Sequence, residues 1–323
     1  MAKVTVLMAV YNAADYLPQA LDSLLAQTLK DIQVVCIDDA STDGSPQILA
    51  DYARRDSRIE VITLTENQGQ AQARNEGLKR AKGDCVCMLD ADDWFEPDAL
   101  EQAVDAMVDD TDAVLFDVSL DYADHAEMYP MPDFQTLTGY DAFVLSLTWR
   151  IHGLYLVKAD LHQRFPYDTT CRLYSDDNTT RLHYLYARRV GRCTGVYHYR
   201  QHASATHQVS VRRFDYLRAN ESMKRILQEQ RVGRQVESLY ETHRWHNLVG
   251  VYMFYFVHGR ELPEADRRYG LAELHRAWLG IDRSLLDRRA AAKFGYRPMP
   301  SWTLFRLQEW LYFTLRGFLG KNY

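Results

Sequence analysis

The chain has 323 residues, of which 47% are apolar and 25% charged, and its 38 basic and 44 acidic side chains give a net charge of −6. This composition excludes a wholly disordered chain, and the length suits about two domains. The charge is unevenly spread, because residues 1–140 carry 9 basic and 27 acidic side chains whereas residues 141–323 carry 29 and 17. The acidic N-terminal region is a poor surface for phosphate backbones, so nucleic acid is not expected as a partner.

Short apolar runs alternate with longer amphipathic ones through the first 120 residues. The apolar runs predict strands at 4–10, 32–37, 59–64, 85–89 and 113–118. The amphipathic runs between them predict helices at 15–27, 45–54, 70–82 and 97–108. This alternation is typical of βαβ units, so we expect an α/β fold with a mostly parallel, Rossmann-like sheet covered by helices on both faces. Ligands of such sheets bind beyond the carboxyl ends of the strands, which here means after Val10, Ile37 and Leu89.

The pattern changes after residue 120. Residues 121–138 are acidic and contain prolines, which indicates a loop. The elements expected next are helix 140–147, helix 177–187 and strand 195–200. From Arg213 to the C-terminus the pattern is helical, with basic residues interspersed. We therefore expect one domain over 1–210 and a mainly helical region over 211–323.

Two features bear on the cellular location. No run of 18 or more uncharged apolar residues occurs, so no membrane-spanning helix is predicted, and the N-terminal segment lacks the apolar core of a secretory signal. The five cysteines include no C-x-x-C pair, and we interpret them as reduced core thiols. A cytoplasmic protein is expected, one that could also lie on the inner face of the cell membrane.

Acidic residues follow two of the predicted strands. Asp38-Asp39 could accept hydrogen bonds from a base or a ribose, or could simply cap the next helix. Asp90-Ala91-Asp92-Asp93 places three carboxylates within four residues, and such groups repel one another unless a cation neutralises them. Mg²⁺ and Mn²⁺ prefer oxygen ligands of this kind, and the alternative is a solvated acidic turn. No G-x-G-x-x-G follows the first strand, which argues against a dinucleotide site.

Four segments in order resemble the family-2 glycosyltransferases of the GT-A fold, of the bacterial surface-polysaccharide type. They are VYNAADYLPQALDSLLAQTL, IDDASTDGS, NQGQAQARNEGL, and AKGD leading to LDADDW. The resemblance covers roughly residues 3–120. It implies a nucleotide-sugar-binding half at 1–120 and an acceptor half at 121–210. It also implies an inverting, metal-dependent transfer of a sugar from a nucleotide-sugar donor.

The resemblance assigns donor contacts to residues after the first two strands and on the third helix. Ala9 and Tyr11 would contact the donor, with Tyr11 packing on the base. Asp39 would hydrogen-bond the edge of a uracil-like base, and Arg74 would help to position the nucleotide or its phosphates. UDP is the expected nucleotide because most of the family uses it.

The LDADDW segment contains the family's D-x-D motif. Asp92 would be the main ligand of a Mn²⁺ or Mg²⁺ ion, with Asp90 near the ribose or the metal. Asp93 and Trp94 would lie nearest the transferred sugar and the acceptor, a saccharide or a lipid-linked saccharide.

The family usually carries its general base as the aspartate of a Glu-Asp pair at a helix start. The matching pair here is Asp176-Asp177, just ahead of the predicted helix. Because an aspartate stands where the family has glutamate, either carboxylate could be the base, and we expect Asp177. An ordinary helix N-cap is the alternative.

Residues 197–204 resemble the family's Y-x-Y-R-x-H-x-x-S segment. Arg200 and His202 would then stabilise the diphosphate after bond cleavage, alongside the metal. The alternative is a half-exposed strand without a catalytic role.

Two other functions remain open from the sequence. A sugar nucleotidyltransferase needs a glycine-rich basic loop after the first strand, and Tyr11-Asn12-Ala13-Ala14 is unlike one. The other alternative is a non-catalytic relative that binds a nucleotide-sugar or a carbohydrate. The chain retains Asp39, Asp90, Asp92 and Asp177, which argues against this alternative but does not exclude it.

The C-terminal segment 302–319 carries an apolar stripe at helical spacing. Its members are Leu304, Leu307, Leu311, Leu315 and Phe318. Residues 281–323 hold eight basic and three acidic side chains. The stripe could lie on an anionic membrane surface, or could pack on the protein's own helical region or on a second subunit.

Overall fold

The computed structural model describes residues 2–171, 174, 176–201 and 209–320. These residues form two compact units. The N-terminal unit extends to about residue 203, and the C-terminal unit follows it and also includes Tyr174. The sequence analysis placed the boundary at residue 210.

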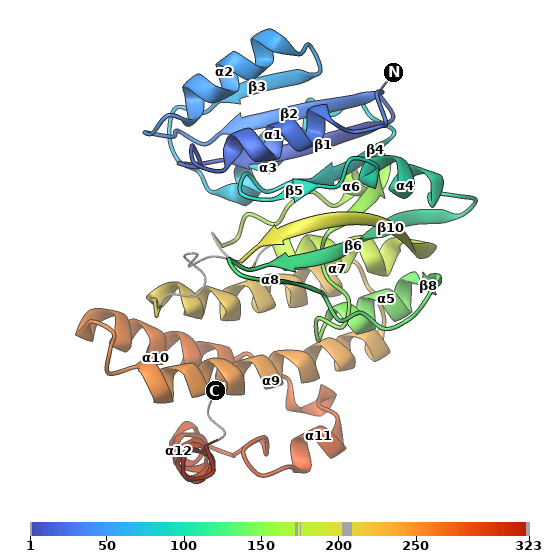
Figure 1. Ribbon diagram of the computed structural model, residues 1–323. Helices are drawn as coiled ribbons and strands as arrows, with labels where there is room; N and C mark the ends of the chain where they lie inside the picture. Colours follow the sequence, from blue (N-terminus) through green and yellow to red (C-terminus); the bar gives the residue numbers. More distant parts are fainter. Residues whose placement is uncertain (1, 172–173, 175, 202–208, 321–323) are drawn as a thin grey trace. The chain divides into compact units, whose positions relative to one another are not determined.

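The N-terminal unit is built on one mixed sheet, which has ten strands within the described residues. The strands along its main path are β3 (Ile59–Thr63), β2 (Ile32–Asp38), β1 (Val4–Val10), β4 (Cys85–Met88), β9 (Tyr155–Lys158), β6 (Thr111–Asp121), β10 (Arg189–Arg200) and β5 (Trp94–Phe95). Figure 1 shows the blue strands β1 and β2 side by side, and the yellow β10 beside the green β6.

Most of the long pairings are parallel, as expected. Strand β1 pairs in parallel with β2 and β4, β2 with β3, and β6 with β10. Strand β9 runs antiparallel between β4 and β6, and it was not predicted from the sequence. It has four residues, too few for a period-2 signal to stand out from its surroundings.

The predicted loop at 121–138 was wrong in part. It contains β7 (Ala126–Met128), which pairs with β6, and β8 (Thr136–Thr138), which pairs with β10. Both are three-residue edge strands, and all three residues of β7 are exposed. Such strands are stabilised by their pairing partners and carry no apolar pattern that the sequence could reveal.

Helices cover both faces of the sheet. They are α1 (Leu17–Leu25), α2 (Ser45–Arg55), α3 (Gln70–Leu78), α4 (Ala99–Asp105), α5 (Gly139–Ser146), α6 (Ala159–Arg164) and α7 (Asp176–Tyr186). Alternate residues of β1 enter two cores: Val6 and Met8 pack in the cluster that contains the apolar residues of α1, whereas Leu7 packs in the cluster that contains those of α3. This alternation is the pleat of a strand that is buried on both faces.

The C-terminal unit is helical, as the pattern from Arg213 onward predicts. Its α-helices are α8 (Asp215–Glu229), α9 (Arg234–His258), α10 (Glu264–Leu279), α11 (Arg288–Ala292) and α12 (Trp302–Phe318). Aromatic side chains dominate its core, and the Phe305 ring lies 5.5 Å from the rings of both Trp245 and Tyr252. In the described part of the chain, no helix has the length and apolar content needed to cross a membrane.

Candidate active site

Strand ends converge where the parallel-sheet rule predicts a ligand site. The residues after β4 supply Asp90, Asp92 and Asp93, and one carboxylate oxygen from each lies within 4.8 Å of the others. The segment after β1 supplies Tyr11, whose side chain is 52% exposed, and Ala9 in β1 is half-buried.

Strand β10 fixes the position of this carboxylate cluster. The Tyr197 hydroxyl donates to Asp93 Oδ2 at 2.7 Å and accepts from the Asp90 backbone N–H at 3.2 Å. The Arg200 backbone N–H donates to Asp93 Oδ1 at 2.8 Å. Burial raises the pKa of Asp93 to about 9, and the charges of Asp90 and Asp92 add to the rise. A cation held by Asp90 and Asp92 would relieve this repulsion, so the donor set fits a divalent metal.

Arg74 on α3 links the carboxylate cluster to the start of α7. Its guanidinium is buried, forms an ion pair with Asp90, and places Nη1 3.6 Å from Asp176 Oδ2. Burial lowers the pKa of Arg74, but Asp90 and Asp176, with the ring of Tyr167 nearby, raise it overall, so the group stays charged. Arg74 therefore lies behind Asp90, and any effect that it has on a nucleotide would pass through this carboxylate.

The two candidate bases begin α7 and differ in exposure. The side chain of Asp176 is 36% exposed, whereas that of Asp177 is 15% exposed and lies 3.8 Å from Arg181 Nη2. Burial raises the pKa of Asp177 to about 7. A carboxylate with this pKa can accept a proton near neutral pH, which suits a general base.

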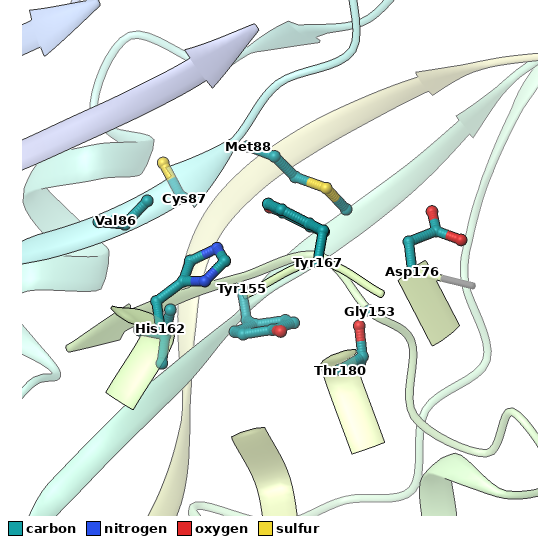
Figure 2. A pocket seen from close by; sticks show the side chains of 10 residues that line it. Val86, Cys87, Met88, Gly153, Tyr155, His162, Tyr167, Asp176 and Thr180 are labelled. Atoms are coloured by element: carbon teal, nitrogen blue, oxygen red, sulfur yellow. The ribbon is translucent and has the colours of Figure 1, made fainter. Parts of the chain in front are cut away.

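Asp176 also lines a small pocket behind the site. Figure 2 shows the Tyr167 ring between His162 and Asp176, with Tyr155 and Thr180 nearby. The enclosed space is about 10 Å³, roughly the room for one water molecule. A space of this size excludes a sugar ring.

Asp39 is buried and holds the segment that leads into α3. Its two carboxylate oxygens accept from the backbone N–H groups of Gln68 and Gly69, both at 2.8 Å. Gly69 has a φ of +90°, a conformation that glycine adopts at little cost. The carboxylate therefore fixes this loop, and its contact with a base stays a prediction.

Arg200 braces the D-x-D segment. Its Nε donates to the Asp92 carbonyl at 2.8 Å and its Nη2 to Gln19 Oε1 at 2.6 Å. Its guanidinium also lies over the Trp94 ring, 4.7 Å from the centroid, and the His198 ring stacks on Trp94 at 4.8 Å between centroids. The predicted donor residue His202 lies outside the described residues.

Sequence reasoning missed several residues that shape the site. Tyr197 lies in the Y-x-Y-R segment, where its place on a buried strand position could have identified it. Gln19 and Tyr167 gave no such signal, because each reaches the site from an element distant in sequence: Gln19 bonds Arg200, and the Tyr167 ring packs on Arg74, 5.4 Å from Cζ to centroid.

The chain is similar to known proteins in sequence and in fold. The model of a family described as glycosyl transferase family 2 matches residues 5–181. The chain belongs to this family. The resemblance to this family that was drawn from the four motifs is confirmed.

Curated bacterial relatives match part of this chain. The putative glycosyltransferase EpsH of Bacillus subtilis is 31% identical over 214 residues, which are 62% of this chain and 62% of EpsH. The putative teichuronic acid biosynthesis glycosyltransferase TuaG of B. subtilis is 41% identical over 113 residues, 35% of this chain and 45% of TuaG. The family-2 glycosyltransferases thus match this chain over less than two thirds of their own length.

Solved structures confirm the GT-A-like α/β fold with its helical C-terminal region. Residues 1–349 of S. aureus TarS in complex with UDP-GlcNAc align with a TM-score of 0.72 at 18% identity, covering 99% of this chain and 92% of that one. The mannosyltransferase PcManGT from Pyrobaculum calidifontis, in complex with GDP-Man and Mn²⁺, aligns with a TM-score of 0.52 at 20% identity, covering 99% and 88%.

Proposed function

We propose that the protein is an inverting, metal-dependent glycosyltransferase of surface-polysaccharide synthesis. It would transfer a sugar from a nucleoside diphosphate donor, most simply a UDP-sugar, to a hydroxyl of a saccharide or lipid-linked acceptor. The observation that carries the proposal is the cluster of Asp90, Asp92 and Asp93 at the end of β4, joined through Arg74 to the carboxylate pair on α7. Complexes of similar folds with UDP-GlcNAc and GDP-Man support the donor class.

Asp92 and Asp90 would hold a Mn²⁺ or Mg²⁺ ion. Such an ion, when bound, neutralises charge that develops on the diphosphate leaving group. Asp93 is engaged by Tyr197 and by the Arg200 backbone, so its part is to fix the segment beside the transferred sugar, with Trp94 next to it. The presence of Mn²⁺ in the PcManGT complex supports this choice of cofactor.

Asp177 would act as the general base. It would take the proton of the acceptor hydroxyl while that oxygen bonds to the anomeric carbon and the bond from this carbon to the diphosphate breaks, which inverts the configuration. Asp176 is the alternative within the pair. Each carboxylate of the pair stands near a guanidinium, since Asp176 lies 3.6 Å from Arg74 and Asp177 lies 3.8 Å from Arg181. Burial favours Asp177 as the base, because it raises the pKa of that carboxyl to about 7.

The remaining donor contacts follow the family pattern. Tyr11 would stack on the base, with Ala9 and Asp39 beside it, and Arg200 and His202 would face the diphosphate. The exposure of Tyr11 supports its assignment.

The acceptor would also decide where in the cell the protein acts. A lipid-linked acceptor would lie at the inner face of the cell membrane, so the protein would act there as a peripheral protein. The names of the relatives EpsH and TuaG, a putative glycosyltransferase and a putative teichuronic acid biosynthesis glycosyltransferase, support a role in surface-polymer synthesis.

The decisive experiment replaces the main metal ligand. Asp92→Ala should retain the melting temperature of the free protein, because the side chain lies at a rim. It should lose the Mn²⁺-dependent rise in melting temperature that UDP produces in the parent protein, and with it transfer and donor hydrolysis. Asp98→Ala, at an exposed position, is the matched control and should behave as the parent. Unchanged Mn²⁺-dependent UDP binding in Asp92→Ala would overturn the metal assignment.

A further inference from the structure

Helix α12 has two faces with different surroundings. Its inner residues Phe305, Tyr312 and Phe313 are buried, and the Phe313 ring stacks with Tyr252 of α9 at 6.5 Å. Trp302 contacts Trp278 of α10 at 5.7 Å between centroids. These contacts dock the helix on the C-terminal unit without using its outer face.

The outer face is a continuous row of large apolar side chains, each between 43% and 85% exposed. They are Leu304, Leu307, Trp310, Leu311, Leu315 and Phe318. This row contains the whole stripe identified in the sequence, so packing of the stripe in the unit's own core is wrong. The reason is that Phe305, Tyr312 and Phe313 of the same helix fill that core instead. Contiguous exposed apolar surface of this kind marks an interaction site.

Within α12, the charged side chains that are not buried are basic. The single acidic residue of α12, Glu309, is fully buried, whereas Arg306 is exposed. Exposed basic residues also precede the helix, among them Lys293 and Arg297. Across residues 281–323, eight basic and three acidic side chains give a net charge of +5. The outer face is thus apolar with a basic margin.

Two occupants could cover such a face, a second copy of the chain or an anionic lipid surface. A two-fold pairing of α12 with itself would bring the same basic margin of both copies to one interface, and like charges would repel. Anionic headgroups would instead pair with the margin while the leucine row enters the acyl region, as interfacial helices do. Trp310 is of the residue type that favours this boundary.

We infer that the outer face of α12 docks the protein, with the helix lying parallel to the surface, on an anionic lipid leaflet. The inference deepens the proposed function, on which the choice of the inner leaflet of a cell membrane rests. It identifies the docking element by its residues: the row from Leu304 to Phe318 inserts, and Arg306 pairs with headgroups.

Flotation of the full chain with vesicles tests this inference. In low salt the protein should float with vesicles of phosphatidylcholine and phosphatidylglycerol and stay at the bottom with phosphatidylcholine alone. Leu307→Asp/Leu311→Asp should lower the bound fraction at least about tenfold, because two inserted side chains become charged. The matched control Val108→Asp/Met128→Asp adds the same two charges at equally exposed positions of the N-terminal unit and should float as the parent.

A second readout does not depend on those variants. Binding of anionic vesicles should shift the tryptophan emission of the parent protein to the blue, and Trp310→Phe should lose most of that shift while still floating. Failure of the parent protein to float with anionic vesicles would overturn the inference. A concentration-dependent dimer that only Leu307→Asp/Leu311→Asp abolishes, without vesicle binding, would assign the face to a second copy.

The catalytic proposal is tested separately in the same assay. Asp92→Ala should float as the parent does, and Leu307→Asp/Leu311→Asp should bind UDP with Mn²⁺ as the parent does. A parent protein that floats with anionic vesicles but shows no Mn²⁺-dependent UDP binding would count against the proposed function alone. A parent protein that binds UDP with Mn²⁺ but does not float would count against the docking face alone.

Discussion

Buried carboxylates occur in both units of the protein, and the two units treat them differently. In the N-terminal unit, Asp93 receives hydrogen bonds from Tyr197 and Arg200 and stands within 4.8 Å of two further carboxylates. In the C-terminal unit, Glu309 is fully buried in an aromatic core and accepts a hydrogen bond from its neighbour Gln308 at 3.1 Å. Among the described residues, its Oε2 has no hydrogen-bond partner.

The pKa values of the two groups rise for different reasons. Burial raises both, but at Asp93 the charges of Asp90 and Asp92 contribute as well. Burial alone raises the pKa of Glu309 to about 8, against the weak opposing effect of Gln308. A carboxylate cluster at a strand end can be neutralised by a cation, whereas an isolated carboxyl in a core is neutralised by a proton. The first arrangement can hold a metal ion, and the second makes the stability of the fold depend on pH.

The largest effect is expected at the catalytic carboxylates. Asp177→Asn should lower the rate of transfer by about 10²–10⁴-fold, because general-base assistance has that magnitude, and leave donor affinity near that of the parent. The rate of the parent should rise with pH through about 7, since Asp177 accepts a proton only when ionised and its pKa is raised to about 7. Steady-state kinetics between pH 5.5 and 8.5 measure both. Greater damage from Asp176→Asn would reverse the assignment within the pair.

The next largest effect is expected at Arg74, the buried arginine that pairs with Asp90 in the N-terminal unit. Arg74→Met should destabilise the protein by about 1.5–3 kcal/mol, because it removes a buried guanidinium and leaves the partly buried Asp90 carboxylate, 26% exposed, without its partner. Mn²⁺ should recover part of this loss by neutralising Asp90. Arg54→Met, which removes an exposed pair with Asp51, is the control and should cost less than about 1 kcal/mol. Equal losses in urea denaturation for the two variants would contradict the role of Arg74.

The smallest effect concerns the pH dependence of stability that the buried Glu309 causes. Between pH 4.5 and about 8 the folded protein keeps a proton on Glu309 that the unfolded chain has released, so stability falls as pH rises through this window. Glu309→Gln should remove that dependence and be more stable than the parent at pH 9 by about 1–3 kcal/mol.

The control for this prediction is a second buried glutamate of the C-terminal unit, Glu241. Glu241 is paired with Lys224 at 3.0 Å and Arg244 at 2.7 Å, so Glu241→Gln should destabilise at pH 5 and at pH 9 alike. Tryptophan fluorescence reports this unit, which holds four of the six tryptophans, during denaturation. A Glu309→Gln variant that follows the pH dependence of the parent would place the titrating group elsewhere.

The sequence by itself determined the β1–α1–β2–α2–β3–α3–β4 order, the sheet edge at which the candidate site residues gather, and the apolar stripe of α12. Each rests on short-range information: apolar periodicity sets the element type, and the carboxyl ends of parallel strands set the edge where Asp39 and Asp90 lie. The D-x-D segment could be recognised from the sequence because its residues are neighbours in the chain.

Only the tertiary structure decided which groups meet. Strand β9 enters between β4 and β6, Arg74 comes to lie between Asp90 and Asp176, and Tyr167 packs on the guanidinium. The same holds for α12, where periodicity shows an apolar stripe but the competition of Phe305, Tyr312 and Phe313 for the core leaves that stripe exposed. These outcomes depend on contacts between residues far apart in the chain, whose free energies no local pattern contains.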